Sequence, residues 1–186
     1  GTTMFLMGSS YLYKYTLTTG YDVSTASYSS TSVNLNSQSS NARGLTFTPD
    51  GSKLFICCAS DDGIDEYSTE GQWAQTQKVV ASDAAGSDQF SGYDEGKAIA
   101  FSGDGNYLLV GAYAEDTGNT QAGSAYVYTL SGSTYGSEVI IRCPALSDYD
   151  GFDYFGWSVD LDLDGDTAII GAKWGGSPTE RGNAFV

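Results

Sequence analysis

The chain has 186 residues, of which 40% are hydrophobic, so it is long enough to bury a core and is not expected to be disordered. It contains no histidine, which excludes His-ligated zinc and catalysis through a Ser-His-Asp or Cys-His pair. Its formal charge of -15 would repel a phosphate backbone, so we expect no nucleic-acid partner. Cations or neutral sugars suit such a surface better, unless the acids only keep it soluble.

The composition favours short strands joined by tight turns. Gly is frequent (24) and Pro is rare (3), while Tyr (14), Phe (8) and Trp (3) together supply many residues of high β propensity. No run approaches the roughly 18 to 20 apolar residues that span a bilayer, and no segment resembles a secretion leader, so membrane insertion is not expected. Gly1 and Val186 both fall within expected strands, which indicates a piece of something longer.

One pattern recurs four times along the chain: an apolar strand, an Asp-Gly turn, a second apolar strand and an aromatic strand. The first copy lacks the first strand and the turn. The copies are residues 3–8 with 12–15, residues 44–56 with 64–67, residues 98–112 with 123–128, and residues 158–172 with 182–186. The turns of the last three copies are Asp50-Gly51, Asp104-Gly105 and Asp164-Gly165, spaced 54 and 60 residues apart. This period suits a four-stranded propeller blade.

The strands of each copy have different hydrophobic patterns. The second strand is continuously apolar, as in residues 54–56, 107–110 and 168–170, which predicts burial on both faces. The aromatic strand alternates, so we expect it to lie nearer the outside. The Gly of each turn supplies the positive φ that a tight hairpin requires. The sequence therefore predicts an all-β fold, a β-propeller of four-stranded antiparallel blades.

The copies at the two ends are incomplete. Copy one lacks its first strand and copy four lacks its last, which predicts fourteen strands in a single propeller over residues 1–186. The expected repeats are roughly 1–43, 44–90, 91–150 and 151–186. Because unpaired sheet edges invite association, we expect strand pairing with other copies of the chain or with flanking parts of a longer chain.

Residues 78–186 resemble the FG-GAP repeats of integrin-type propellers. The resemblance is carried by Phe155-Gly156-Trp-Ser-Val159, by residues 164–172 (Asp-Gly-Asp-Thr-Ala-Ile-Ile-Gly-Ala) and by residues 123–128 (Gly-Ser-Ala-Tyr-Val-Tyr). Residues 1–70 instead look like a repeat of marine phage and bacterial surface proteins, through residues 11–28 and 44–55. These resemblances imply a propeller, and they are weak for function because propellers host unrelated activities.

One segment matches the start of a calcium-binding loop. It places oxygens at alternate positions and Gly165 at the sixth, through Asp160, Asp162, Asp164 and Asp166. The ninth and twelfth positions, Ala168 and Gly171, offer no carboxylate. Integrin-type repeats place calcium in this hairpin, in a longer loop. The alternative is a strand with two wet aspartates that leads into an ordinary turn. Further ligands could come from the preceding loop, unless its acids are simply solvated: Asp148, Asp150 and Asp153.

Three tryptophans and three cysteines complete the candidates. Trp73, Trp157 and Trp174 are candidate ligand-binding residues, because flat aromatic faces stack on sugar rings, although blade packing is the alternative. Adjacent Cys57 and Cys58 point to opposite faces of a strand, so at most one of them can face Cys143. Three buried thiols, or one disulfide and one spare thiol, both fit the sequence.

The sequence thus predicts a non-catalytic structural and adhesive propeller module of an extracellular filament, a cell-surface protein or a virion appendage. The alternative is a calcium-dependent propeller that binds carbohydrate or a cell-surface receptor, with calcium as its cofactor. A carboxylate pair could cleave glycosides, but no pair is marked by its surroundings, so we do not expect an enzyme.

Overall fold

The computed structural model describes residues 1–8, 10–36, 42–58, 63–69, 73–92, 98–116, 121–143, 153–174 and 182–186. Within these ranges the chain forms fourteen strands and one 3-10 turn, Val23–Thr25. None of the described residues belongs to a helix long and apolar enough to span a membrane. The strands are β1 (Thr3–Met7), β2 (Tyr11–Leu17), β3 (Ala26–Asn34), β4 (Ala42–Phe47), β5 (Lys53–Cys58), β6 (Gly63–Ser68), β7 (Gln75–Val80), β8 (Ile99–Phe101), β9 (Tyr107–Ala112), β10 (Ser124–Ser131), β11 (Thr134–Arg142), β12 (Phe155–Leu161), β13 (Ala168–Ala172) and β14 (Asn183–Phe185).

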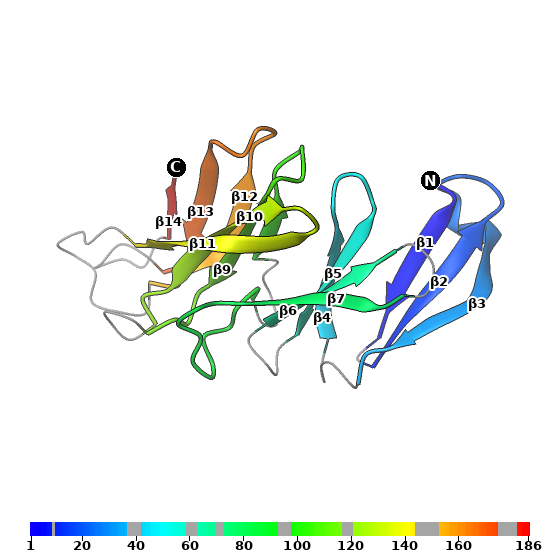
Figure 1. Cartoon of the computed structure of the whole chain (residues 1–186), viewed down its shortest axis with the longest axis horizontal. Coiled ribbons are helices and arrows are strands. Elements are labelled where there is room, and N and C mark those ends of the chain that lie inside the picture. Colours follow the sequence, from blue (N-terminus) through cyan, green and yellow to red (C-terminus); the bar gives the residue numbers. More distant parts are fainter. Residues whose placement is uncertain are drawn as a thin grey trace.

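The strands assemble into four antiparallel sheets in which each strand pairs with its neighbours in the chain. Sheet 1 is β1–β3, sheet 2 is β4–β7, sheet 3 is β8–β11 and sheet 4 is β12–β14. In Figure 1 sheet 1 lies at one end of the molecule, sheet 2 in the middle, and sheets 3 and 4 at the other end. The predicted all-β class and four-stranded antiparallel sheets are confirmed, and the first and last sheets have three strands among the described residues.

The three Asp-Gly hairpins close in the same way. In each, the amide before the turn donates to the carbonyl after it: Thr48 to Lys53 at 3.1 Å, Ser102 to Tyr107 at 3.0 Å and Asp162 to Thr167 at 3.0 Å. The turn glycines adopt left-handed backbone with φ of +73°, +73° and +76°: Gly51, Gly105 and Gly165. The predicted role of these glycines is therefore confirmed.

In sheets 2 and 3, successive side chains of the second strand point to opposite faces of the sheet and pack against the neighbouring sheet on each side. In β5, Phe55 packs toward sheet 3, whereas Leu54 packs toward sheet 1. The burial predicted for this strand position is confirmed in β5 and β9. It is wrong for β13, where Ile169 is 46% exposed, because the described residues place no sheet over that face of sheet 4.

The aromatic strand of sheet 2 is β6, and it does not show the predicted alternation of buried and exposed residues. All residues from Gly63 to Tyr67 are buried, including the carboxylates of Asp65 and Glu66. The reason is that β7 covers the edge of β6 while sheets 1 and 3 cover its two faces. Glu66 is paired across the sheet with Phe55, so its side chain enters the interface with sheet 3.

The cysteines occupy three different parts of the core. Cys57 packs between sheets 2 and 3 and Cys58 between sheets 1 and 2, as expected of neighbours in a strand. Cys143 is half-buried against the cluster between sheets 3 and 4. The structure therefore contains no disulfide between these three residues.

The antiparallel order gives each sheet two different ends. We call one end the hairpin face; it carries the Asp-Gly turns and the β10–β11 turn. The opposite end, the connection face, carries the links between sheets and the β9–β10 loop. Candidate functional residues occur at both ends.

Candidate functional site

A cavity of about 370 Å³ opens between sheets 2 and 3 at the hairpin face. We call it the hairpin cavity. Two Asp-Gly hairpins and the β10–β11 hairpin enclose it, so its walls come from segments distant in the sequence. Its lining residues are Thr48, Pro49, Asp50, Ser52, Lys53, Gly103, Asp104, Gly105, Leu130 and Tyr135. The volume lies within the range of small-molecule sites.

Each of these two Asp-Gly hairpins contributes one carboxylate to the cavity wall. The hydroxyl of Thr48 donates to Asp50 at 2.6 Å and the Ser52 amide donates to it at 3.0 Å, and these bonds lower the pKa of Asp50. The hydroxyl of Ser102 donates to Asp104 at 2.6 Å and the Asn106 amide at 3.0 Å, which lowers the pKa of Asp104 in the same way. Both carboxylates are therefore ionised at neutral pH.

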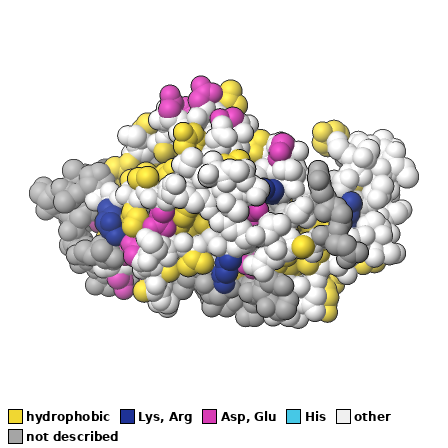
Figure 2. All heavy atoms as spheres, viewed as in Figure 1, with side chains coloured by type: hydrophobic (Ala, Val, Ile, Leu, Met, Phe, Trp, Pro, Cys, Tyr) yellow, Lys and Arg dark blue, Asp and Glu magenta, His cyan; other side chains and the backbone are white. Residues whose placement is uncertain are grey.

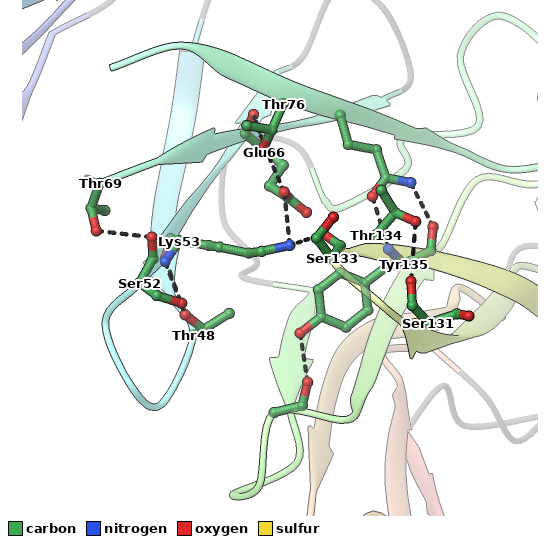
Figure 3. Close-up of polar contacts among 12 residues, drawn as sticks. Thr48, Ser52, Lys53, Glu66, Thr69, Thr76, Ser131, Ser133, Thr134 and Tyr135 are labelled. Atoms are coloured by element: carbon green, nitrogen blue, oxygen red, sulfur yellow. Dashed lines mark hydrogen bonds and ion pairs between the residues drawn. The ribbon is translucent and has the colours of Figure 1, made fainter. Parts of the chain in front are cut away.

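A buried ion pair lies beside the cavity (Figure 3). The ammonium of Lys53 is 2.9 Å from a carboxylate oxygen of Glu66, whose side chain is fully buried. The Thr76 hydroxyl donates to the same oxygen at 2.6 Å. Lys53 also donates to the carbonyl of Ser133 in the β10–β11 turn. Lys53 therefore joins sheet 2 to sheet 3 and neutralises Glu66 inside their interface.

Tyr135 forms the wall of the cavity on the sheet 3 side. Its hydroxyl donates to the carbonyl of Gly105 at 2.6 Å, and its amide and carbonyl bond the side-chain amide of Gln77 at 2.8 and 2.5 Å. Figure 3 shows the ring of Tyr135 between the Lys53 ammonium and the β8–β9 turn, which contains Gly105. Burial, followed by the charges of Glu66, Asp50 and Asp104, raises the pKa of Tyr135, so the phenol stays neutral.

The predicted calcium residues lie at the edge of sheet 4. Asp160 belongs to β12 and the other three to the turn that follows, and the side chains of Asp160, Asp162, Asp164 and Asp166 are all exposed. Desolvation opposes ionisation of Asp162, but bonds from the Thr167 amide, from Asp166 and from the Gly165 amide lower its pKa.

The four aspartates do not converge on one point. In the described part of the chain no three acidic or thiol side chains are grouped to hold a metal ion. The calcium site stays a prediction. Asp148 and Asp150 lie outside the described residues, and Asp153, expected in a solvated loop, is 3% exposed.

The predicted tryptophans separate into two environments. Trp73 packs on Phe5 with ring centroids 5.0 Å apart, so it fills the interface between sheets 1 and 2. Trp157 and Trp174 lie at the connection face, where both contact Tyr154, with ring centroids 5.9 and 4.7 Å from its ring. Trp174 is 41% exposed. The ammonium of Lys173 lies 3.9 Å from the centroid of Trp157.

Polar contacts of sheet 3 hold the link between sheets 2 and 3 in place. Asp83, in that link, accepts hydrogen bonds from the hydroxyl of Tyr126 at 3.0 Å and from the guanidinium of Arg142 at 2.8 Å. The hydroxyl of Tyr128 donates to Glu138 at 2.7 Å. Burial, with these carboxylates, raises the pKa of both tyrosines.

Because of these three buried tyrosines, we expect the protein to unfold at alkaline pH. The folded pKa of Tyr126, Tyr128 and Tyr135 is raised, so the stability they contribute is complete below the unfolded value of about 10 and is lost as the pH rises above it. Above a pH of about 10, each of these tyrosines should lower the unfolding free energy by about 1.4 kcal/mol per pH unit. We expect phenolate absorbance at these residues to appear together with the loss of circular dichroism. Substitution Tyr128→Phe should move the alkaline midpoint upward; an unchanged midpoint would contradict the assignment.

Sequence reasoning did not identify the residues around the hairpin cavity. Lys53 and Glu66 are thirteen positions apart on strands expected to differ in burial, and Tyr135 had no role assigned. The usable signal was the repeat itself, since Asp50 and Asp104 occupy matching turn positions that stacked sheets bring to one end.

Comparisons with known proteins agree with this architecture. The sequence model of the FG-GAP repeat family matches residues 73–128 and 145–186, which confirms the resemblance of the C-terminal part. The resemblance of residues 1–70 to marine phage and bacterial repeats stays a prediction. No match was found among curated protein sequences.

Three solved structures share the fold over 99% of this chain. A Bacteroides uniformis protein, provisionally named a 6-phosphogluconolactonase, has a TM-score of 0.63 at 14% identity, with 50% of its chain covered. The β-propeller domain of Cps50 (Swd1) from Myceliophteria thermophila has 0.59 at 15%, with 49% covered. A Lactobacillus plantarum protein has 0.56 at 16%, with 51% covered. At these identities the likeness shows the fold alone, a β-propeller. The chain spans about half the length of each of these proteins.

Proposed function

This chain belongs to the FG-GAP repeat family, and we propose that it is a non-catalytic structural and adhesive propeller module. The proposal places it in an extracellular filament, a cell-surface protein or a virion appendage, as a single unit over residues 1–186. Two features support a binding role over a catalytic one. The chain has no histidine. Its two cavity carboxylates are ionised and hydrogen-bonded to their own turns, which suits charge recognition better than proton transfer.

The observation that carries the proposal is the exposure of apolar side chains on the outer faces of sheets 1 and 4. Ile169 of β13 is 46% exposed, whereas Leu109, at the matching position of β9, is fully buried against sheet 4. On sheet 1, Leu6 and Tyr28 are 48% and 47% exposed. Both faces thus have the composition of an interface between sheets.

A second copy of the chain is the partner we propose for these faces. The chain spans about half the length of similar propellers, so two copies would supply the sheets of one ring. Sheet 4 of one copy would then meet sheet 1 of the other, a head-to-tail contact that closes into a ring or extends into a filament.

Light scattering coupled to size exclusion tests this assembly. We expect a mass of at least twice 19.6 kDa. Ile169→Lys should reduce the mass to that of a single chain, because it places a charge in the interface. As a matched control, Val139→Lys alters a residue of β11 that is 58% exposed and lies away from the proposed interface, so it should leave the assembly intact. A folded monomer at all concentrations would contradict self-association and would leave flanking sequence as the source of the missing sheets.

A second function is favoured by the aromatic residues Tyr154, Trp157 and Trp174. Their rings adjoin one another at the connection face, and aromatic faces of this kind stack on sugars. This supports a carbohydrate- or receptor-binding propeller, with calcium as an added requirement if the four aspartates bind it. Glycan-array binding that is lost in Trp174→Ala would support it. Calorimetry without heat at millimolar calcium would remove the calcium requirement.

A further inference from the structure

We infer that the hairpin cavity binds the basic side chain of a partner peptide, an ammonium or a guanidinium group. The cavity lies within one chain, so this inference goes beyond the assembly proposed above and does not depend on it. Three observations carry it: the charge of the wall, the absence of a counter-cation, and the apolar surface between the charges.

The negative charge of the cavity wall is fixed in place. Asp50 and Asp104 come from two different sheets, and both influence the same phenol, that of Tyr135. Each carboxylate is oriented by hydrogen bonds from the hydroxyl two residues before it and the amide two residues after it. A ligand therefore meets ionised groups that are already oriented, which limits the entropy cost of binding.

These two charges have no cationic partner in the described part of the chain. Every group that donates to Asp50 or Asp104 is a neutral hydroxyl or amide. Lys53 lines the cavity, but its ammonium pairs with Glu66 at 2.9 Å. With that pair neutral, the cavity retains the charge of two carboxylates, which attracts a cation and disfavours an anion.

The remaining wall suits an organic cation better than a metal ion. Pro49, Leu130 and the ring of Tyr135 provide apolar surface against which the stem of a lysine or arginine can pack. Calcium needs six to eight oxygens, and no three acidic residues of the described chain are grouped around one point. A guanidinium can instead bond two separate carboxylates through its several donors.

Nuclear magnetic resonance titration with N-acetylarginine amide tests the site, with the neutral isostere N-acetylcitrulline amide as the control ligand. We expect saturable shifts at the amides of Ser52 and Asn106, which donate to the two carboxylates, and a millimolar dissociation constant. Citrulline should shift neither amide. Arginine binding should also weaken as the pH falls through the lowered pKa of Asp50 and Asp104.

A pair of double variants separates a site from general attraction to an acidic protein. Asp50→Asn with Asp104→Asn keeps the oxygens that accept the turn hydrogen bonds but removes both charges, and should weaken arginine binding at least about tenfold. Asp22→Asn with Asp160→Asn removes two exposed charges elsewhere, one of them in a similar turn, and should change it less than about twofold.

Three results would overturn the inference. Equal weakening in both double variants would show attraction to net charge alone. Equal shifts with citrulline would show that charge is not recognised. Calcium chloride that produces the same shifts at Ser52 and Asn106 and displaces arginine at lower concentration would assign the cavity to an inorganic cation.

Discussion

Substitution Lys53→Met is expected to lower the unfolding free energy by about 3–5 kcal/mol. Glu66 is fully buried between sheets 2 and 3, and Lys53 is the cation paired with it. Removal of the ammonium leaves a buried carboxylate that accepts a hydrogen bond from Thr76 but has no counter-charge, and it also removes the bond to the Ser133 carbonyl. Urea denaturation followed by circular dichroism measures the loss.

A second substitution identifies the cause of that loss. Glu66→Gln in the Lys53→Met background removes the buried charge while it keeps a similar shape, so it should recover most of the lost stability. A loss below about 1 kcal/mol in Lys53→Met, or no recovery in the double variant, would show that the pair contributes little to the interface.

The repeat made the fold predictable. Three Asp-Gly turns between apolar strands define hairpins by local chemistry alone, because the glycine φ is required wherever the hairpin lies. The continuously apolar runs Leu54–Ile56 and Tyr107–Val110 then predicted strands covered on both faces by neighbouring blades, and the structure buries Leu54–Ile56 and Leu108–Val110. The wrong burial at Ile169 follows from its position in the array, because the same apolar pattern is exposed where no described sheet covers it.

The candidate site was less predictable because it depends on contacts between sheets. Nothing local distinguishes Glu66, a buried acid, from an acid on a wet strand face; only the docking of Lys53 and of the β10–β11 turn makes its burial tolerable. Gln77 and Tyr135 are 58 positions apart, and their reciprocal bonds arise from the stacking of β7 against β11. All three tryptophans were candidate ligand-binding residues. The structure places Trp157 and Trp174 against the same tyrosine, whereas Trp73 packs between sheets 1 and 2.

Substitution Gly123→Ala is expected to destabilise the chain by about 3 kcal/mol or more. Gly123 directly precedes β10 and has a φ of +82°, and a Cβ there would lie 2.1 Å from the carbonyl oxygen of Phe155 and 2.8 Å from its amide nitrogen. These are backbone atoms, and the Phe155 amide is bonded to the carbonyl of Ala122 at 3.0 Å, so sheet 4 cannot move aside without the loss of that bond.

The matched control is Gly132→Ala, which has a similar φ of +64° but no atom within 4 Å of the new Cβ. It should cost about 1 kcal/mol, the backbone strain alone. The difference between the two variants, measured by thermal and urea unfolding, therefore isolates the contact between sheets 3 and 4. If both alanines cost the same, the close approach of Gly123 to Phe155 does not hold the sheets together. A larger loss in Gly123→Ala would show that the glycine is needed for the approach of one sheet to the next, because only a residue without a side chain lets the end of the β9–β10 loop lie against Phe155.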